Sequence, residues 1–284
     1  MPHNDYILTL SCPDRTGIVY RVSALLFELG CNILDAQQFG DEETGRFFLR
    51  VHFDLSDAVS ADTLRAAVAP LAADYAMDWQ LHDARRRARL LVLVSRIGHC
   101  LNDLLFRAHS QQLAVDIAAV ASNHRDFETL ATSYGVPFHY LPVDNDNRAA
   151  QEQQILDLVA SEQVDLVVLA RYMQILTPRL CEALAGRAIN IHHSFLPSFK
   201  GARPYHQAFE RGVKIIGATA HYVTTDLDEG PIIEQDVARV DHAMPPRELV
   251  RVGSDVESRV LASAVRAHVE HRILLNGHRT VVFR

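Results

Sequence analysis

The stretch Leu90-Leu91-Val92-Leu93-Val94 decides the fold of most of this chain. Five apolar residues in a row indicate a strand whose two faces are both covered by other parts of the protein. A second buried strand is expected at Val164–Ala170, where residues 166–170 are again five apolar residues in a row. Strands that are buried on both faces occur mostly in parallel sheets with helices on either side. We therefore predict an α/β domain built around these two runs.

Around these two runs, patterns typical of strands and of helices alternate along the chain. Such alternation predicts a Rossmann-like, mostly parallel sheet with right-handed crossovers. In these sheets the ligand site lies at the carboxyl ends of the strands, so the loops that follow strands are the place to look for chemistry. The further strands are expected at residues 114–121, 138–143, 187–190, 215–223 and 280–283, and the helices at residues 127–134, 149–161 and 247–275.

The residues before Leu90 follow a different pattern. A short strand at Tyr6–Ser11 is followed by a turn, by apolar residues at helical spacing from Ile18 to Leu29, and by extended chain. Strict alternation from Phe47 to Leu55 predicts a half-buried antiparallel strand, and one more helix and strand follow. The order βαββαβ predicts a four-stranded sheet with two helices on one face. We expect two domains, at residues 1–84 and 85–284, joined by the basic run Arg85–Arg89 as a solvated linker.

The composition narrows the class of protein. A formal net charge of -7 over 284 residues argues against a dedicated nucleic-acid or membrane-surface binder. The longest apolar runs are too short to cross a bilayer, and the residues from Met1 to Asp5 lack a basic secretory signal. The four cysteines are far apart and form no CxxC pair, which is typical of reduced thiols. We therefore expect a cytoplasmic protein.

The segment Ala188–Pro197 carries the first candidate catalytic residues. Alternation along a strand puts Asn190 and His192 on one side and Ile189 and Ile191 on the other. An amide and an imidazole side by side offer a hydrogen-bond donor and a titratable proton to one substrate carbonyl group. A histidine at the end of a strand also occurs as a purely structural residue, so this pair alone leaves both interpretations open.

The second candidate segment is the acidic turn Asp226-Leu227-Asp228-Glu229-Gly230. Acidic residues beside Gly-Pro usually form a solvated bend. The catalytic interpretation has one support: this turn and the Asn-x-His pair occur together in the chain, and each follows a predicted strand. The histidines His193, His206 and His221 raise the alternative of a zinc site, but no carboxylate lies at obvious ligand spacing from them. We expect no catalytic metal.

The order Asn-x-His, Leu-Pro and His-(x)5-Leu-Asp-x-Gly-Pro resembles the folate-dependent formyltransferase family. The resemblance implies that Asn190, His192 and Asp228 form the catalytic trio. It also implies that no cofactor is needed, because the formylated folate is the substrate. The folate-binding residues that it implies are Met173, Gln174, Ile175, Leu176, Thr224, Asp226 and Gly230.

The stretch LTLSCPDRTGIVYRVSALLFELGCNILDAQQF, residues 8–39, is similar to an ACT domain, a small regulatory module that often binds amino acids. A glycine at the start of a helix exposes backbone N–H groups that can hold a carboxylate. The alternative is that Asp14 and Thr16 only cap the helix and that this domain only dimerises the chain. The resemblance implies a homo-oligomer and an amino-acid effector bound at Asp14, Arg15, Gly17, Ile18, Asn32 and Ile33.

Departures from the formyltransferases favour one branch of the family. The loop at residues 95–102 holds a single glycine, where the glycinamide ribonucleotide formyltransferases have a glycine-rich loop that cradles a phosphate. His193 replaces a common proline, and the chain has no basic C-terminal domain for tRNA. With an ACT domain in front, the chain resembles the formyltetrahydrofolate deformylases.

That resemblance implies hydrolysis of 10-formyltetrahydrofolate to formate and tetrahydrofolate, which supplies formate for purine biosynthesis and balances one-carbon pools. Two alternatives stay open. One is a formyltransferase that acts on an amine acceptor. The other is a regulatory binding protein whose second domain is inactive, which the presence of Asn190, His192 and Asp228 argues against.

Overall fold

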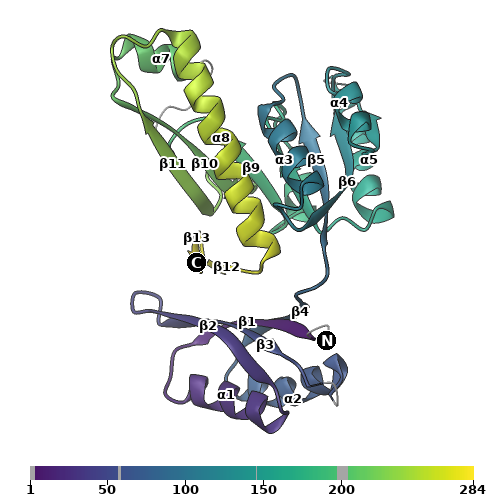
Figure 1. Cartoon of the computed structure of the whole chain (residues 1–284), viewed down its shortest axis with the longest axis vertical. Coiled ribbons are helices and arrows are strands. Elements are labelled where there is room, and N and C mark those ends of the chain that lie inside the picture. The colour runs from purple at the N-terminus through teal and green to yellow at the C-terminus, as the bar shows by residue number, and fades with distance from the viewer. Residues whose placement is uncertain (1–3, 57–58, 145, 197–203) are drawn as a thin grey trace. The chain divides into compact units, whose positions relative to one another are not determined.

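The computed structural model of the chain describes residues 4–56, 59–144, 146–196 and 204–284. The chain forms two compact units (Figure 1). Unit 1 comprises residues 1–86 together with residues 270–284, and unit 2 comprises residues 87–269. The backbone therefore passes between the units twice, after Arg86 and after Val269.

Unit 1 contains a four-stranded antiparallel sheet in the order β2-β3-β1-β4. The βαββαβ prediction is confirmed. One face of the sheet packs against both helices, through a core that includes Leu8, Leu26, Phe53 and Leu64. The elements are β1 (Asp5–Pro13), α1 (Ile18–Glu28), β2 (Asn32–Asp41), β3 (Arg46–Asp54), α2 (Ala61–Asp74) and β4 (Asp78–Asp83).

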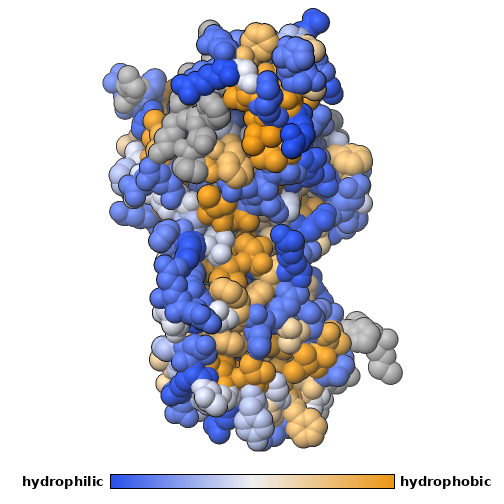
Figure 2. All heavy atoms as spheres, turned by 90° about the vertical axis from the view of Figure 1, so that its left-hand side faces the viewer, coloured by the Kyte–Doolittle hydropathy of each residue, from blue (hydrophilic) through white to orange (hydrophobic). Residues whose placement is uncertain are grey.

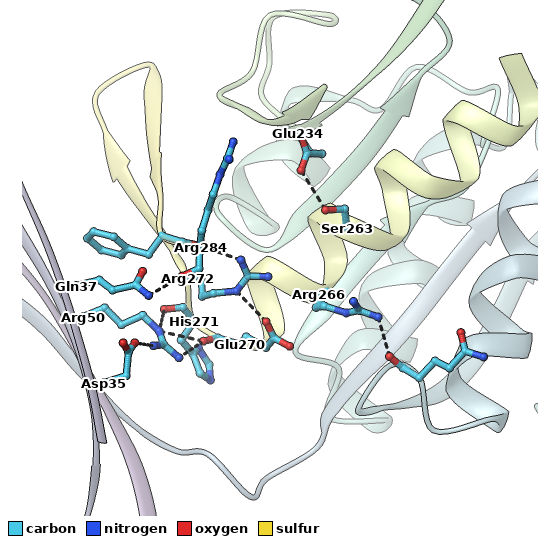
Figure 3. A network of polar contacts seen from close by, with 12 residues as sticks. Asp35, Gln37, Arg50, Glu234, Ser263, Arg266, Glu270, His271, Arg272 and Arg284 are labelled. Carbon is cyan, nitrogen blue, oxygen red and sulfur yellow. Dashed lines mark hydrogen bonds and ion pairs between the residues drawn. The ribbon is translucent and has the colours of Figure 1, made fainter. Parts of the chain in front are cut away.

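The C-terminal hairpin of β12 (Ile273–Asn276) and β13 (Arg279–Val282) belongs to unit 1. Its Leu274 and the following Phe283 form a buried cluster with Phe48 of β3. Arg50 of β3, only 7% exposed, donates to the carbonyl oxygens of Glu270 and His271 at 3.1 and 3.2 Å (Figure 3).

These contacts correct two details of the sequence analysis. The last helix was expected to run to residue 275, but α8 (Pro246–Val269) ends where Arg50 takes up the backbone carbonyl groups that follow it. The compact units also differ from the expected ranges 1–84 and 85–284, because residues 270–284 group with unit 1. The hairpin is short and has few apolar residues, so its sequence does not show that they pack in unit 1.

Unit 2 contains a seven-stranded sheet in the order β11-β10-β9-β8-β5-β6-β7. Pairing is parallel from β9 to β7, whereas β10 pairs antiparallel with both β9 and β11, so β10 is the reversed strand of this sheet. The prediction of a mostly parallel sheet is confirmed. The strands are β5 (Ala88–Val94), β6 (Val115–Ser122), β7 (Phe138–Tyr140), β8 (Leu166–Leu169), β9 (Ala188–His192), β10 (Ile215–Tyr222) and β11 (Ile232–Arg239).

Leu90–Val94 are each 0% exposed, as a strand covered on both faces requires. Helix α8 lies across β9, β10 and β11 and also packs on α3 (Figure 1). Strand β11 and helices α3, α6 and α7 were not predicted. The other helices of this unit are α3 (His99–His109), α4 (Glu128–Ser133), α5 (Arg148–Ser161), α6 (Pro178–Ala183) and α7 (Pro204–Glu210).

The basic run at the junction forms ion pairs on both sides. Arg85 pairs with Asp83 at 2.8 Å within unit 1. Within unit 2, Arg87 and Arg89 pair with Asp116 and Glu162, each at 2.9 Å. Arg85 and Arg86 are exposed, as expected for a solvated linker, whereas Ala88 and Arg89 already belong to β5. Among the described helices, none is long and apolar enough to span a membrane.

Candidate active site

Strand β9 positions the Asn-x-His pair as the alternation predicted. Ile189 and Ile191, at 0% and 3% exposure, pack into the core. Asn190 and His192 lie on the opposite side, Asn190 half-buried and His192 6% exposed. Because β9 lies between β8 and β10 in the sheet, the backbone that carries both side chains is held in place by hydrogen bonds on its two sides.

The acidic turn brings Asp228 to this pair. Its Oδ2 lies 3.3 Å from Nδ1 of His192, and the side chain is 19% exposed. Strand β10 is antiparallel to β9, so its end points away from the carboxyl ends of the parallel strands. The chain therefore has to turn back after Tyr222, and Asp228 adopts a left-handed backbone conformation with φ of 57°. The structure thus joins the three residues of the predicted trio.

His221 also lies in this site, although the sequence suggested it only as a metal ligand. It lies directly opposite Asn190 in the β9–β10 pairing and is 2% exposed. Its Nδ1–H donates to the carbonyl oxygen of Tyr222 at 2.9 Å, which leaves Nε2 to accept from the Asn190 amide at 3.3 Å. His221 therefore fixes which way the Asn190 amide points. The sequence could not place His221 beside Asn190, because it did not reveal that β10 pairs antiparallel with β9.

The site holds a fixed negative charge. A hydrogen bond from His192 and the nearby ring of His221, whose Nε2 lies 3.7 Å from Oδ1, lower the pKa of Asp228 well below its usual range, although partial burial opposes this shift. Asp228 is therefore ionised at neutral pH. On the other side of the ring, Nε2 of His192 is buried and has no hydrogen-bond partner among the described residues. A buried polar atom without a partner at the end of a strand indicates a place for a ligand.

The loop after β8 carries the predicted pterin-binding residues. Met173 and Ile175 are 55% and 63% exposed, which is unusual for apolar side chains beside a rigid sheet. The backbone of the loop is anchored, because Met173 N–H donates to Ser95 Oγ at 3.0 Å and Arg148 donates to the Ile175 carbonyl at 2.6 Å. Exposed apolar residues on an anchored backbone are suited to a flat aromatic ligand.

The remaining predicted folate residues lie in the acidic turn. Thr224 donates to the carbonyl oxygen of Asp226 at 3.1 Å, and the Asp226 side chain is exposed. Gly230 is buried against the backbone of Tyr222. Leu176 of the β8 loop and Val223 at the start of this turn pack on the same core cluster. The β8 loop and the chain leading into the acidic turn are therefore held by the same core cluster. Folate binding by either segment stays a prediction.

The candidate effector residues lie in unit 1. Helix α1 begins after Gly17, whose φ is 94°, and has no side-chain cap. The alternative that Asp14 and Thr16 cap this helix is therefore wrong. Arg15 donates to the carbonyl oxygen of Asp74 and lies 3.7 Å from the centre of the Tyr75 ring. Asn32 and Ile33 are exposed on β2, and effector binding at Asp14, Arg15, Gly17, Ile18, Asn32 and Ile33 stays a prediction.

Within the described residues, one group of side chains is spaced so that it could hold a metal ion, formed by His99, Cys100 and Glu257. His99 Nε2 lies 2.9 Å from Glu257 Oε2, and Arg171 Nε lies 3.4 Å from the same oxygen. A metal ion would have to displace a guanidinium that already balances this carboxylate. The group does not include His193, His206 or His221.

His193 makes the stability of unit 2 depend on pH. Burial, with smaller contributions from Arg171 and His192, lowers the pKa of His193 to about 4. A histidine whose pKa is lower in the folded state binds more protons when unfolded, so its stabilising contribution is present above pH ~6.5 and is lost toward pH ~4. We expect the free energy of unfolding, measured by urea titration, to fall by about 1–3 kcal/mol over this range. In His193→Gln this fall should shrink, and an unchanged fall would contradict the assignment.

Comparison with known families agrees with this architecture. Residues 88–265 match the formyl transferase family model, and residues 6–68 match the ACT domain model. The fold and the site therefore define a protein of the formyl transferase class with an ACT domain in front.

Relatives over the full length give the branch of this class. The chain is 49% identical over 280 residues to a formyltetrahydrofolate deformylase of Corynebacterium sp. (strain P-1), covering 98% of each chain. The crystal structure of a formyltetrahydrofolate deformylase from Burkholderia mallei matches with a TM-score of 0.95 and 51% identity, covering 100% of both chains. A glycinamide ribonucleotide transformylase from Symbiobacterium toebii covers 70% of this chain, at 31% identity and a TM-score of 0.65. The chain belongs to the formyltetrahydrofolate deformylase family.

Proposed function

We propose that this chain hydrolyses 10-formyltetrahydrofolate to formate and tetrahydrofolate. The observation that carries the proposal is the convergence of Asn190, His192 and Asp228, with Nε2 of His192 buried and lacking a partner among the described residues. The deformylase relatives span the whole chain, whereas the transformylase from Symbiobacterium toebii covers 70% of it. This difference favours hydrolysis over transfer to an amine.

The mechanism begins with the formyl oxygen. Attack on the formyl carbon turns this oxygen into an oxyanion, which needs donors placed in advance. His221 holds one N–H of the Asn190 amide, so the other N–H is free to donate to the oxyanion. His192 Nε2 supplies the second contact. Both groups are fixed on β9, so little reorganisation accompanies the reaction.

Asp228 orients the water and balances charge. Its carboxylate accepts the proton that the water loses and stabilises positive charge on the His192 ring, whose Nε2–H donates to the oxyanion. The water oxygen bonds to the formyl carbon, the bond from that carbon to the folate nitrogen breaks, and the proton passes from Asp228 to that nitrogen; the second proton of the water leaves when formic acid ionises to formate. The products are formate and tetrahydrofolate. These side chains supply the oxyanion donors and the proton transfer, and we propose that no metal or cofactor takes part; metal analysis of active protein tests this.

The direct test is product analysis with 10-formyltetrahydrofolate as the sole substrate. We expect formate and tetrahydrofolate in equal amounts without any added acceptor. If neither product forms until an amine is added, the alternative of a formyltransferase is correct. If the folate binds but no product forms under either condition, the second domain is a binding module.

His221→Ala tests the positioning of Asn190. Without its partner the amide can rotate, so we expect kcat to fall by about tenfold or more while KM changes little. The KM should hold because the exposed residues of the β8 loop are untouched. Steady-state kinetics on protein with a normal thermal melt is the measurement. A KM increase at constant kcat would mean that His221 acts in binding instead.

We further propose that unit 1 forms a homo-oligomer. The large apolar residues that it exposes on α1 and β2 include Tyr20 at 74%, Phe27 at 81% and Leu34 at 49%. Apolar atoms are visible among polar ones on the face of this unit in Figure 2. Strand β2 is an edge strand, and unpaired edges with exposed apolar residues favour association. Light scattering of wild type and Phe27→Asp tests this, and monomers in both would contradict it.

Regulation and cellular role complete the proposal. An amino acid bound by the ACT domain is the proposed effector, with no nucleic-acid or membrane partner, and adding single amino acids to the assay tests it. The four cysteines are free, which supports a reducing, cytoplasmic location. There the released formate would supply purine biosynthesis and balance one-carbon pools.

A further inference from the structure

A buried charged cluster lies beside the catalytic trio and has no part in the mechanism above. We call Glu257, His99, Arg171 and Tyr205 the Glu257 cluster. Glu257 of α8 is 1% exposed; His99 lies 2.9 Å and Arg171 3.4 Å from its Oε2, and Tyr205 donates to Oε1. Burial alone would raise the pKa of Glu257, but His99, Arg171 and Tyr205 together lower it, so the carboxylate is ionised. The carboxylate is therefore surrounded by donors and cannot bind a further ligand.

The position of this carboxylate is unusual. The side chains of His99 and Cys100, the first two residues of α3, lie beside the Glu257 carboxylate, so a side-chain anion lies near the first turn of the helix that follows β5. In α/β sheets this place commonly binds the phosphate of a ligand, because free N–H groups and the helix dipole favour an anion. Gly98 ends the loop without a side-chain cap on α3. Glu257 thus takes the position of an external anion.

The surrounding packing leaves little free volume. A Cβ atom at Gly98 would lie 2.3 Å from the Phe127 ring, and one at Gly253 would lie 2.1 Å from the Tyr205 hydroxyl. Contacts this short show that the loop after β5 and the facing turn of α8 are filled by side chains up to the backbone. An acceptor the size of a phosphorylated amine would have to displace them.

His193 connects this cluster to the trio. Its ring stacks on His192 with 5.0 Å between centroids and lies 6.4 Å from the Tyr205 ring. Arg171 follows β8 and His192 ends β9, and these neighbouring parallel strands end at the same edge of the sheet. The cluster therefore borders the site from the side of α8.

We propose that the Glu257 cluster determines the choice of nucleophile, because it fills the anion position and the space that a phosphorylated amine acceptor would need and so leaves water to attack the formyl group. This inference rests on the proposed hydrolysis. The relative from Symbiobacterium toebii, a glycinamide ribonucleotide transformylase, uses an acceptor that carries a phosphate, as its name states. The two reactions differ only in the attacking atom: water oxygen gives formate, and an amine nitrogen gives a formamide and releases the same tetrahydrofolate.

His99→Gly tests the proposal on the full-length protein, with glycinamide ribonucleotide, an amine that carries a phosphate, as the acceptor. The measured quantity is the ratio of formylated glycinamide ribonucleotide to formate, determined by mass spectrometry with 10-formyltetrahydrofolate as donor. We expect this ratio to rise at least about tenfold in His99→Gly, which opens the space beside Glu257. His99→Gln refills the space and keeps a donor, so the ratio should return toward that of the wild type.

A matched control comes from α8, the helix that carries Glu257. Ser263 donates to Glu234 at 3.0 Å (Figure 3) and not to a residue of the Glu257 cluster, so Ser263→Ala should leave the ratio unchanged. If His99→Gly does not fold, Tyr205→Leu opens the same space and carries the same expectation. A ratio equal to that of the wild type in the folded variant overturns the proposal, because a purely structural cluster would change stability and rate but not the product ratio. Failure of the proposed function would instead appear as absence of formate from the wild type.

Discussion

His192→Ala is expected to lower kcat for formate release by about a hundredfold or more. Nε2 of His192 is the buried ring nitrogen that lacks a partner among the described residues, and it provides the oxyanion contact in the proposed mechanism. Asp228→Asn should have a loss of the same order, since it preserves shape but removes the charge that stabilises the protonated ring. The measurement is the steady-state rate of formate release with saturating 10-formyltetrahydrofolate.

A control histidine separates this effect from general damage. His109 of α3 packs edge-on against the Tyr134 ring, outside the site, and His109→Gln should keep normal activity. Both active-site variants should still bind the folate, because the β8 loop is intact. Near-normal turnover in Asp228→Asn would remove Asp228 from the mechanism.

Gly230→Ala is expected to cost the protein more than about 2 kcal/mol of stability and at least tenfold in activity. A Cβ atom at this position would lie 1.7 Å from the carbonyl oxygen of Tyr222. That backbone cannot move freely, since Tyr222 N–H donates to the carbonyl of Pro231 at 2.9 Å. The turn would have to open, and Asp228, two residues earlier, would leave His192.

Gly135→Ala is the matched control. Gly135 has a positive φ of 73° but nothing within 4 Å of an added Cβ atom. It should therefore lose only the roughly 1–2 kcal/mol that a left-handed conformation costs alanine, with activity unchanged. Urea unfolding and formate release on the same preparations give both quantities. If Gly135→Ala and Gly230→Ala lose the same free energy of unfolding, the backbone around Tyr222 adjusts to the added Cβ atom without cost and the prediction is wrong.

The local pattern of apolar residues was enough to predict the strands that form the centre of the core of unit 2. The runs Leu90–Val94 and Leu166–Leu169 are buried strands because a residue sequence without polar positions has no face to turn to water. The helices α3, α6 and α7 were missed, although Cys100, Leu101, Leu104 and Leu105 of α3 do follow helical spacing. Glu257 also carried a signal, as a carboxylate within the apolar stripe of α8.

By itself, the sequence determined the fold class, the two-domain order and the side-by-side position of Asn190 and His192, because these depend on periodicity along one strand. Only the tertiary structure decided what approaches that pair. Asp228 reaches His192 through a turn after an antiparallel strand, His221 meets Asn190 through strand register, and Glu257 arrives on a helix more than 60 residues further along the chain. Contacts between distant segments depend on strand direction and helix packing, and neither is encoded in the spacing of nearby residues.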